Sequence, residues 1–173
     1  YSQLVSGNFF NALHIRPAAG RFITPGEVER PGGDPVVVIS HAYWQTHYAG
    51  SPSAIGRSIR INELELTIVG VAPENFQGTI LALQFDVWVP ATLAPSLFSG
   101  STELTDRSQR GYSVLGRLRT GADEAAATGE FVLAMRELAA SFPESNERIS
   151  GELIPYWKTP RGPKRMFLTA LWV

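Results

Sequence analysis

The clearest pattern in the chain is a run of four β-branched residues at 36–39. A continuous apolar run of this length predicts a strand that is buried on both of its faces. Two other stretches, 58–61 and 64–69, alternate apolar and polar positions on either side of Asn62-Glu63. This period of two predicts a β-hairpin whose turn lies at those two residues. A further short strand is predicted at 86–89.

Helical patterns occur at three places. Short helices are predicted at 8–14 and 42–48, and a longer helix begins after Asp123, which can cap its first turn, and ends at Pro143. Apolar residues three and four positions apart give this helix one stripe that is expected to face a core. The stripe consists of Ala127, Phe131, Met135, Leu138 and Phe142.

Strand-like segments flank the long helix, at 112–120 before it and at 148–154 after it, so the sequence predicts a β-α-β unit here. Two polar stretches predict loops. Residues 24–35 are rich in proline and glycine, which indicates an exposed loop. Residues 94–111 are rich in serine, threonine and glycine and predict a long loop or a boundary between two lobes.

The composition narrows the class of protein. A chain of 173 residues with 44% apolar and 18% charged residues is long enough to form one domain with a real core. The net charge of -1 argues against a broad nucleic-acid surface, although the chain has a local basic tail at 158–165. The absence of cysteine excludes disulfides and thiolate metal sites, and it suits an oxidising compartment.

The last eight residues, 166–173, are strongly apolar and follow the basic residues Lys158, Arg161, Lys164 and Arg165. They predict either the start of a truncated membrane helix or a last strand on the core. The sequence alone favours neither interpretation. No stretch reaches the roughly 18 to 20 apolar residues that span a bilayer, and no signal peptide is visible.

Candidate catalytic groups do not form a recognisable site. Ser40 and His41 are neighbours, which does not make a catalytic dyad, and no nucleophile elbow is present. His14, His41 and His47 lack the close spacing of zinc ligands. The pairs Glu27 with Glu29 and Glu63 with Glu65 are interpreted as solvated charge, and no Walker or dinucleotide motif occurs. We therefore expect no catalytic, cofactor-binding or metal-binding residues and no cofactor.

Structural roles are expected for the other conspicuous residues. Gly20, Gly56, Gly70 and Gly111 lie at element boundaries, where a positive φ angle or close backbone approach is useful. Arg21, Arg57 and Arg117 lie next to or near such glycines and are expected to bind carboxylates or carbonyls that hold turns. Trp44 and Trp88 lie in core-like patterns and are expected to be buried rather than to stack on sugars.

Short motifs follow one another in a fixed order along the chain. They are VSGNFF at 5–10, RPAAGRF at 16–22, PVVVIS at 35–40, AYWQTHYAG at 42–50, IGRSIRIN at 55–62, TIVGVAPENF at 67–76 and DVWVP at 86–90. In this order they resemble the MacB-like periplasmic core domain of MacB/FtsX-family ABC transporter permeases. The resemblance runs from about Val5 to Tyr156. The chain departs from it at His14-Ile15, where Gly-Val is usual, and at Asn62-Glu63, where Asn-Gly is usual.

The resemblance implies an α+β fold with two lobes. Residues of about 1–35 and 111–158 would form a membrane-proximal β-α-β lobe, and residues of about 36–110 an inserted, mainly β lobe. Residues 159–173 would be a linker and the start of a truncated transmembrane helix. The family usually has a further strand and helix before the position of Tyr1, so an edge strand of the proximal lobe is expected to be unpaired.

The resemblance also implies a function. The domain would be non-catalytic, would lie on the periplasmic or extracytoplasmic side of the bacterial inner membrane, and would transmit conformational change to an exported substrate or a periplasmic partner. Implied partners are a second permease copy, a cytoplasmic ABC ATPase and a periplasmic adaptor or lipoprotein. Flanking helices would connect it to the membrane, and nucleic acid is not expected. The loops 24–35 and 90–111 are the expected working surface.

Two other functions stay open at this point. The chain could be a stand-alone extracytoplasmic module that binds a peptide, lipid or sugar, and this hypothesis predicts a concave pocket with exposed aromatic side chains. A hydrolase is the third hypothesis, and it requires Ser40, His41 or a pair of acidic residues to converge in a cleft.

Overall fold

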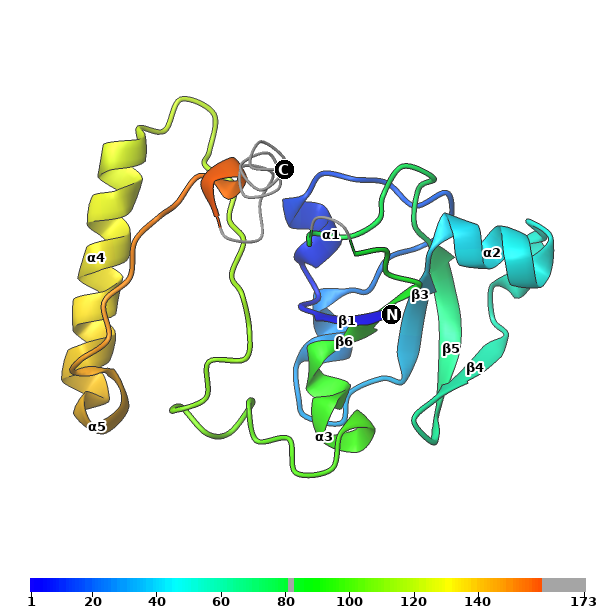
Figure 1. The fold of residues 1–173 in the computed structure, drawn as a ribbon, viewed down its shortest axis with the longest axis horizontal. Helices are drawn as coiled ribbons and strands as arrows, with labels where there is room; N and C mark the ends of the chain where they lie inside the picture. Colours follow the sequence, from blue (N-terminus) through cyan, green and yellow to red (C-terminus); the bar gives the residue numbers. More distant parts are fainter. Residues whose placement is uncertain (81–82, 160–173) are drawn as a thin grey trace, which may run out of the picture. The chain divides into compact units, whose positions relative to one another are not determined.

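The computed structural model describes residues 1–80 and 83–159, and the chain forms two compact units, Tyr1–Asp106 and a second that begins at Arg107. The first unit contains all six strands of the described chain (Figure 1). They are β1 Ser2–Val5, β2 Ala19–Gly20, β3 Val36–Ile39, β4 Ser58–Ile61, β5 Leu64–Val71 and β6 Val87–Pro90.

The six strands form one mixed sheet. Five of them follow the order β1-β6-β3-β5-β2, and β4 lies outside this order and pairs with β5. Parallel pairs join β1 to β6 and β3 to β5, whereas β3 and β6 run antiparallel. Both β4 and β2 pair antiparallel with β5, β4 at residues 64–67 and β2 at residues 70–71. A mixed sheet combined with helices confirms the predicted α+β class. Segments 1–35 and 36–110, expected in different lobes, contribute to the same sheet here.

The central strand β3 is buried along its whole length, as its β-branched run predicts. Val36 and Val38 belong to the apolar cluster on one face of the sheet, and Val37 and Ile39 belong to the cluster on the other face. In β5 an extra residue, Val69, interrupts the pairing with β3. Such a bulge reverses the side to which the following residues point, so that Ile68 and Val71 pack in the same cluster.

The hairpin of β4 and β5 confirms the prediction made from its alternating pattern. Ile59 pairs with Leu66, and the two-residue turn lies at Asn62 and Glu63. Both turn residues have positive φ angles, 43° and 72°, which is the conformation that a type I′ turn requires.

Helices and short 3-10 turns cover the sheet. The α-helices of this unit are α1 Phe9–Ala12, α2 His41–Tyr48 and α3 Ala94–Leu97, and the 3-10 turns are η1 Pro25–Val28, η2 Pro52–Ala54 and η3 Ala91–Leu93. Predictions for α1 and α2 are confirmed within two residues. The prediction of an exposed loop at 24–35 is wrong in part, because η1 buries Glu27. Residues 94–111 were predicted to be a long loop or a boundary between two lobes; α3 lies in this stretch and buries Leu97, and the division between the two units also falls within it.

In the second unit, α4 Glu124–Ser141 is followed by α5 Pro143–Asn146 and by the 3-10 turn η4 Tyr156–Lys158. Asp123 caps α4 by accepting a hydrogen bond from the Ala125 amide, as predicted. The stripe is only partly covered: Phe131 and Met135 are half-buried, and a Cβ on Gly151 would lie 2.7 Å from the Phe131 ring.

The two strands predicted beside α4 are absent from the described part of the second unit. Residues 112–120 and 148–154 form no strand, so this part of the β-α-β prediction is wrong. A strand is stable only when its backbone groups pair with a neighbouring strand. The helix depends on hydrogen bonds within its own segment and forms without such a neighbour.

No helix within residues 1–80 and 83–159 is long and apolar enough to cross a membrane. The predictions for Met166–Val173, for Trp172 and for Arg161, Lys164 and Arg165 lie outside the described residues.

Candidate functional site

The ordered motifs of the sequence have a structural counterpart in a group of five aromatic rings on one face of the sheet. We call it the aromatic cluster; it consists of Phe9, Phe10, Phe22, Phe76 and Trp88. Four different motifs contribute its rings. Phe10 stacks on Phe22 with ring centroids 4.0 Å apart, and it meets Trp88 edge to face at 5.9 Å. Both geometries are favourable for aromatic pairs.

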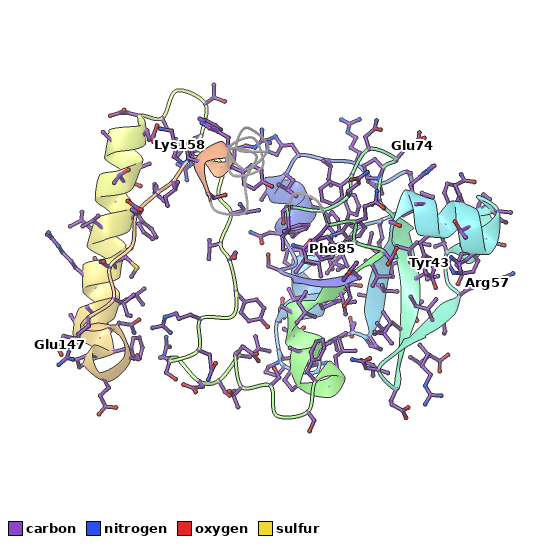
Figure 2. The ribbon with its side chains drawn as sticks, in the orientation of Figure 1. Tyr43, Arg57, Glu74, Phe85, Glu147 and Lys158 are labelled. Atoms are coloured by element: carbon purple, nitrogen blue, oxygen red, sulfur yellow. The ribbon has the colours of Figure 1, made fainter. Side chains whose placement is uncertain are left out.

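Trp88 is fully buried, and its one polar atom has a partner. The indole Nε1 donates to the side-chain oxygen of Gln3 at 3.0 Å, and Gln3 Nε2 donates to the Thr79 hydroxyl at 2.9 Å. A buried indole N–H without a partner would cost free energy. This chain of hydrogen bonds therefore joins strands β1 and β6 to the loop after β5. Figure 2 shows the neighbouring Phe85 in the crowded interior of this unit, where it is 6% exposed.

A close backbone contact places Arg21 beside this cluster. The paired strands β2 and β5 approach so closely that a Cβ on Gly70 would lie 1.9 Å from the Arg21 carbonyl oxygen. A Cβ on Gly20 would lie 2.3 Å from the Val69 carbonyl oxygen. Only glycine permits such an approach. The Arg21 amide then donates to that Val69 oxygen at 2.9 Å, so the start of the Arg21 side chain has a fixed position.

Arg21 and Glu27 form a bidentate ion pair, which we call the Arg21–Glu27 pair. The guanidinium Nη2 donates to Oε1 at 2.6 Å, and Nη1 donates to Oε2 at 2.9 Å. The amide and the hydroxyl of Thr24 also donate to Oε2, at 2.8 and 2.9 Å. Two parallel bonds give an arginine-carboxylate pair both strength and direction, and the carboxylate of Glu27 is satisfied on both oxygens.

The surroundings shift the pKa of both partners. Burial by itself would raise the pKa of Glu27, but the hydrogen bonds from Arg21 and Thr24 and the positive charge outweigh it. The pKa of Glu27 is therefore lowered. The hydrogen bond to Glu27 raises the pKa of Arg21, against the opposing effect of burial. The pair is ionised at neutral pH and holds η1 against β2, and it leaves no proton available for acid-base chemistry.

This pair corrects one sequence prediction and confirms another. Glu27 is not solvated charge, because its side chain is buried against Arg21. The role predicted for Arg21, holding a turn by binding a carboxylate, is confirmed. Its partner could have been found, because Thr24-Pro25-Gly26-Glu27 has the spacing of a capping box. Glu63 is exposed and pairs with Arg60.

Three further residues singled out in the sequence, Ser40, His47 and Arg57, have structural partners. The Ser40 hydroxyl accepts a hydrogen bond from the Tyr43 amide at 3.0 Å and caps α2. His47 stacks on Tyr43 with ring centroids 3.9 Å apart, and Arg57 lies over the Tyr48 ring at 5.9 Å. Figure 2 shows Tyr43 and Arg57 on the side of this unit formed by α2. Within residues 1–80 and 83–159, no group of three His, Asp or Glu side chains is placed to hold a metal ion.

The two expected working loops meet on the first unit. The Gly32 amide donates to the Thr92 carbonyl oxygen at 2.9 Å, which joins 24–35 to the segment after β6. Around this contact Arg30, Pro95 and Phe98 are exposed, and the Phe98 side chain is 45% accessible to water. We call the exposed residues of 29–34 and 92–98 the loop surface. Exposed polar and apolar groups lie together there, on segments joined by a backbone hydrogen bond.

Comparisons with known proteins agree with these features. The sequence profile described as the MacB-like periplasmic core domain matches residues 2–132. The probable export ATP-binding/permease protein MacB of Pseudomonas entomophila is 28% identical over 106 residues, which are 61% of this chain and 16% of that protein. The chain thus spans about a sixth of the length of this curated relative.

A solved structure shows the same fold. The periplasmic region of MacB from Actinobacillus actinomycetemcomitans superposes with a TM-score of 0.55 at 13% identity, over 87% of this chain and 66% of that one. The family profile covers well over half of the sequence and includes the four motifs that supply the aromatic cluster. This chain therefore belongs to the family of MacB-like periplasmic core domains, the periplasmic or extracellular domains of MacB-like ABC transporter permeases.

Proposed function

We propose that this chain is a non-catalytic domain that transmits conformational change across the membrane to an exported substrate or a periplasmic partner. The observation that carries the proposal is that the motif residues have structural roles in the fold. Aromatic motif residues pack in the aromatic cluster, motif glycines allow the close approach of β2 and β5, and Arg21 of a motif pairs with Glu27. Residues used in this way give a rigid body, which a force-transmitting domain needs.

The proposal includes the surroundings implied by the family. The domain would lie on the periplasmic side of the bacterial inner membrane, connected to it through flanking helices. Its partners would be a second permease copy and, where the parent protein uses one, a cytoplasmic ABC ATPase with a periplasmic adaptor or lipoprotein. Support comes from the family match and from the relative's printed description as an export ATP-binding/permease protein.

We propose the loop surface as the contact region for a partner. Loops on a rigid scaffold are the usual position of recognition residues, and here the Gly32–Thr92 hydrogen bond holds two loops together. Arg30 supplies a charged group and Phe98 an apolar one. A patch of this mixed kind fits a protein partner better than a membrane surface.

The division into lobes is also proposed. Residues 111–158 would form the membrane-proximal lobe, supported by the separate unit that begins at Arg107. Residues 36–110 would form the inserted lobe. Residues 1–35, which the family resemblance assigns to the proximal lobe, pack with the sheet of the first unit in this chain, so the proposal relies on the second unit for the proximal lobe.

The first experiment is fractionation of the parent polypeptide. We expect it to sediment with membranes and to resist extraction by high salt and alkaline buffer, because spanning helices would hold it there. A parent that stays in the soluble fraction, and whose isolated domain binds a peptide, lipid or sugar saturably, would contradict the permease proposal and support the stand-alone binding module.

The contact region is tested by site-specific crosslinking in the parent protein. The chain has no cysteine, so a single Ser96→Cys change places one reactive group on the loop surface. Thr46→Cys on the exposed side of α2 is the matched control. We expect a crosslinked product from Ser96→Cys that Thr46→Cys does not give. Equal products from both positions, or a product from Thr46→Cys alone, would contradict the assignment of the loop surface.

A further inference from the structure

The connection between the two units has a defined beginning in the first unit. Leu97, the last residue of α3, is 7% exposed and packs in the apolar cluster under α2 and α3. Its carbonyl oxygen accepts a hydrogen bond from the Asn62 side chain at the tip of the hairpin, at 3.2 Å. The Phe98 amide donates back to the Ala94 oxygen and ends the helix. The chain is therefore fixed to the first unit as far as Leu97.

The connection also has a defined end in the second unit. The guanidinium carbon of Arg107 lies 3.7 Å from the centre of the Phe142 ring, at the end of α4. Arg110 Nη2 donates to the Ser145 carbonyl oxygen at 2.9 Å. Contacts of an arginine with an aromatic face and with the last carbonyls of a helix are both favourable. We call these two residues the arginine clasp; they hold the start of the second unit to α4 and α5.

Residues 98–106 lie between these fixed points. Two turns close within the segment: the Ser101 amide donates to the Phe98 oxygen at 3.1 Å, and the Thr105 amide donates to the Thr102 oxygen at 2.9 Å. Gly100 has a φ angle of 80°, and a Cβ placed on it would meet no other group within 4 Å. Phe98, Thr102 and Leu104 are exposed to water.

Such a segment is suited to rotation. Changing the backbone angles at Ser101 and Thr102, between the two turns, would break neither of them, and rotation at Gly100 would break one hydrogen bond, that of the Ser101 amide. Neither change would remove a buried side chain from the core. By contrast, movement at Leu97 would disturb a buried cluster, and movement at 107–110 would break the clasp. Regions with few buried contacts open at low free energy, and hinges are a few loop residues that absorb the change in φ and ψ.

We infer that residues 98–106 are a hinge on which the two units reorient, and that the arginine clasp fixes its far end. Asn62 and the buried Leu97 fix its near end. Reorientation is then confined to residues 98–106 instead of spreading into α4. A role of this hinge in transmitting movement to a partner rests on the proposed function, but its existence is a property of the chain alone.

Distances between pairs of spin labels test the hinge on the full 173-residue chain, which has no native cysteine. The exposed positions Thr46→Cys and Ala126→Cys measure the distance between units. Thr46→Cys with Glu65→Cys, and Ala126→Cys with Ala140→Cys, are controls within the first and second unit. We expect narrow distributions for both controls and a clearly broader one between units.

An inter-unit distribution as narrow as the controls would overturn the hinge. A broad distribution for the Ala126–Ala140 control would overturn it as well, because a hinge needs two rigid bodies. Neither result bears on membrane fractionation of the parent, so failure of the hinge and failure of the proposed function are distinguished.

The clasp is tested by the mobility of one label at Gln109→Cys, which lies between its two arginines. We expect the double variant Arg107→Ala/Arg110→Ala to lose the slow spectral component of this label. Arg136→Ala, which changes an exposed arginine of α4 outside the clasp, should keep it. Loss of the slow component in both variants, or in neither, would contradict the role of the clasp.

Discussion

Among single residues, Glu27 has the most demanding surroundings. Its carboxylate is buried and accepts hydrogen bonds from Arg21 and from the amide and hydroxyl of Thr24. We expect Glu27→Gln to lower the free energy of unfolding by about 1–2 kcal/mol, the lower part of the range for charged hydrogen bonds, because Arg21 is half exposed. Denaturant unfolding at pH 7 measures the change. Glu29→Gln, an exposed neighbour, should change stability by less than about 0.5 kcal/mol.

The same pair makes a prediction about pH. The pKa of Glu27 in the folded chain is below its ordinary value of 4.5. The pair therefore contributes its full stability at pH values above 4.5, the ordinary pKa. This contribution is lost as the pH falls through the lowered pKa of the folded chain. Between pH 5 and the acid limit of folding, the stability of the native chain should decline more steeply than that of Glu27→Gln. Parallel curves for the two proteins would show that the pair is not responsible.

Gly70 is required by geometry where β2 and β5 pair closely. A methyl group there would overlap the Arg21 carbonyl oxygen, at 1.9 Å, and a backbone atom cannot move aside as a flexible side chain can. We expect Gly70→Ala to cost more than about 2 kcal/mol or to prevent folding. Gly26→Ala is the control, since its Cβ would meet one flexible side-chain atom at 4.0 Å. Equal thermal unfolding temperatures for the two variants would contradict the predicted contact.

At the scale of elements, two tight turns contain residues that are poorly suited to them. His14 follows α1 with a φ angle of 54°, and Glu63 lies in the hairpin turn with a φ angle of 72°. Side chains at such angles cost about 1 kcal/mol. We expect His14→Gly and Glu63→Gly each to stabilise the chain by about 0.5 kcal/mol, because part of that gain is offset by the greater freedom of glycine in the unfolded chain.

Thermal unfolding of the two glycine variants checks this expectation. Thr46→Gly, in the exposed middle of α2, is the matched control and should destabilise by about 0.3 kcal/mol, since its backbone is helical and glycine is a slightly poorer helix former than threonine. If all three changes destabilise equally, the positive φ angles impose no strain that glycine relieves.

An element is predicted well from the sequence when its hydrogen bonds join residues near each other in the chain, and poorly when they join distant segments. β3, the hairpin and α4 were predicted because periodicity, turn residues and a capping aspartate are local signals. Residues 112–120 and 148–154 have strand-like composition, but pairing is not local, and no strand forms there. Glu27 illustrates the same point for the candidate site. Its burial requires the ion pair with Arg21, and Arg21 is positioned by the close approach of Gly20 and Gly70, which are far apart in the sequence.

At the scale of the whole molecule, the two units differ in how much they bury. The hydrophobic residues classed as buried in the described chain all belong to the first unit. In the second unit, α4 keeps Leu133 57% exposed and Leu138 40% exposed. Hydrogen exchange should therefore be slowest at β3, where it reports global unfolding. The α4 amides should exchange through local opening at least about 1–2 kcal/mol more easily. Equal protection of β3 and α4 would contradict this difference.

The aromatic cluster was not predicted, although each of its rings stands in a motif that the sequence displays. Phe10 and Trp88 are 78 positions apart in the chain (88 − 10), and their rings meet only because β1 and β6 are neighbours in the sheet. The exposure of the loop surface was predicted better, and its use as a contact region stays a prediction. Its composition marks it as exposed, and exposure needs no partner elsewhere in the chain.

The burial of Trp88 gives the molecule a built-in optical label. Trp88 is shielded from water in the first unit, whereas Trp157 of the second unit is 61% exposed. An aqueous quencher added to the intact chain reaches Trp157 readily and reaches Trp88 only when the first unit opens. The chain also contains Trp44 and Trp172. Once these two are replaced by phenylalanine, replacing either Trp88 or Trp157 as well would leave the emission of the other to be followed, so that the opening of each unit can be timed separately without attaching a dye.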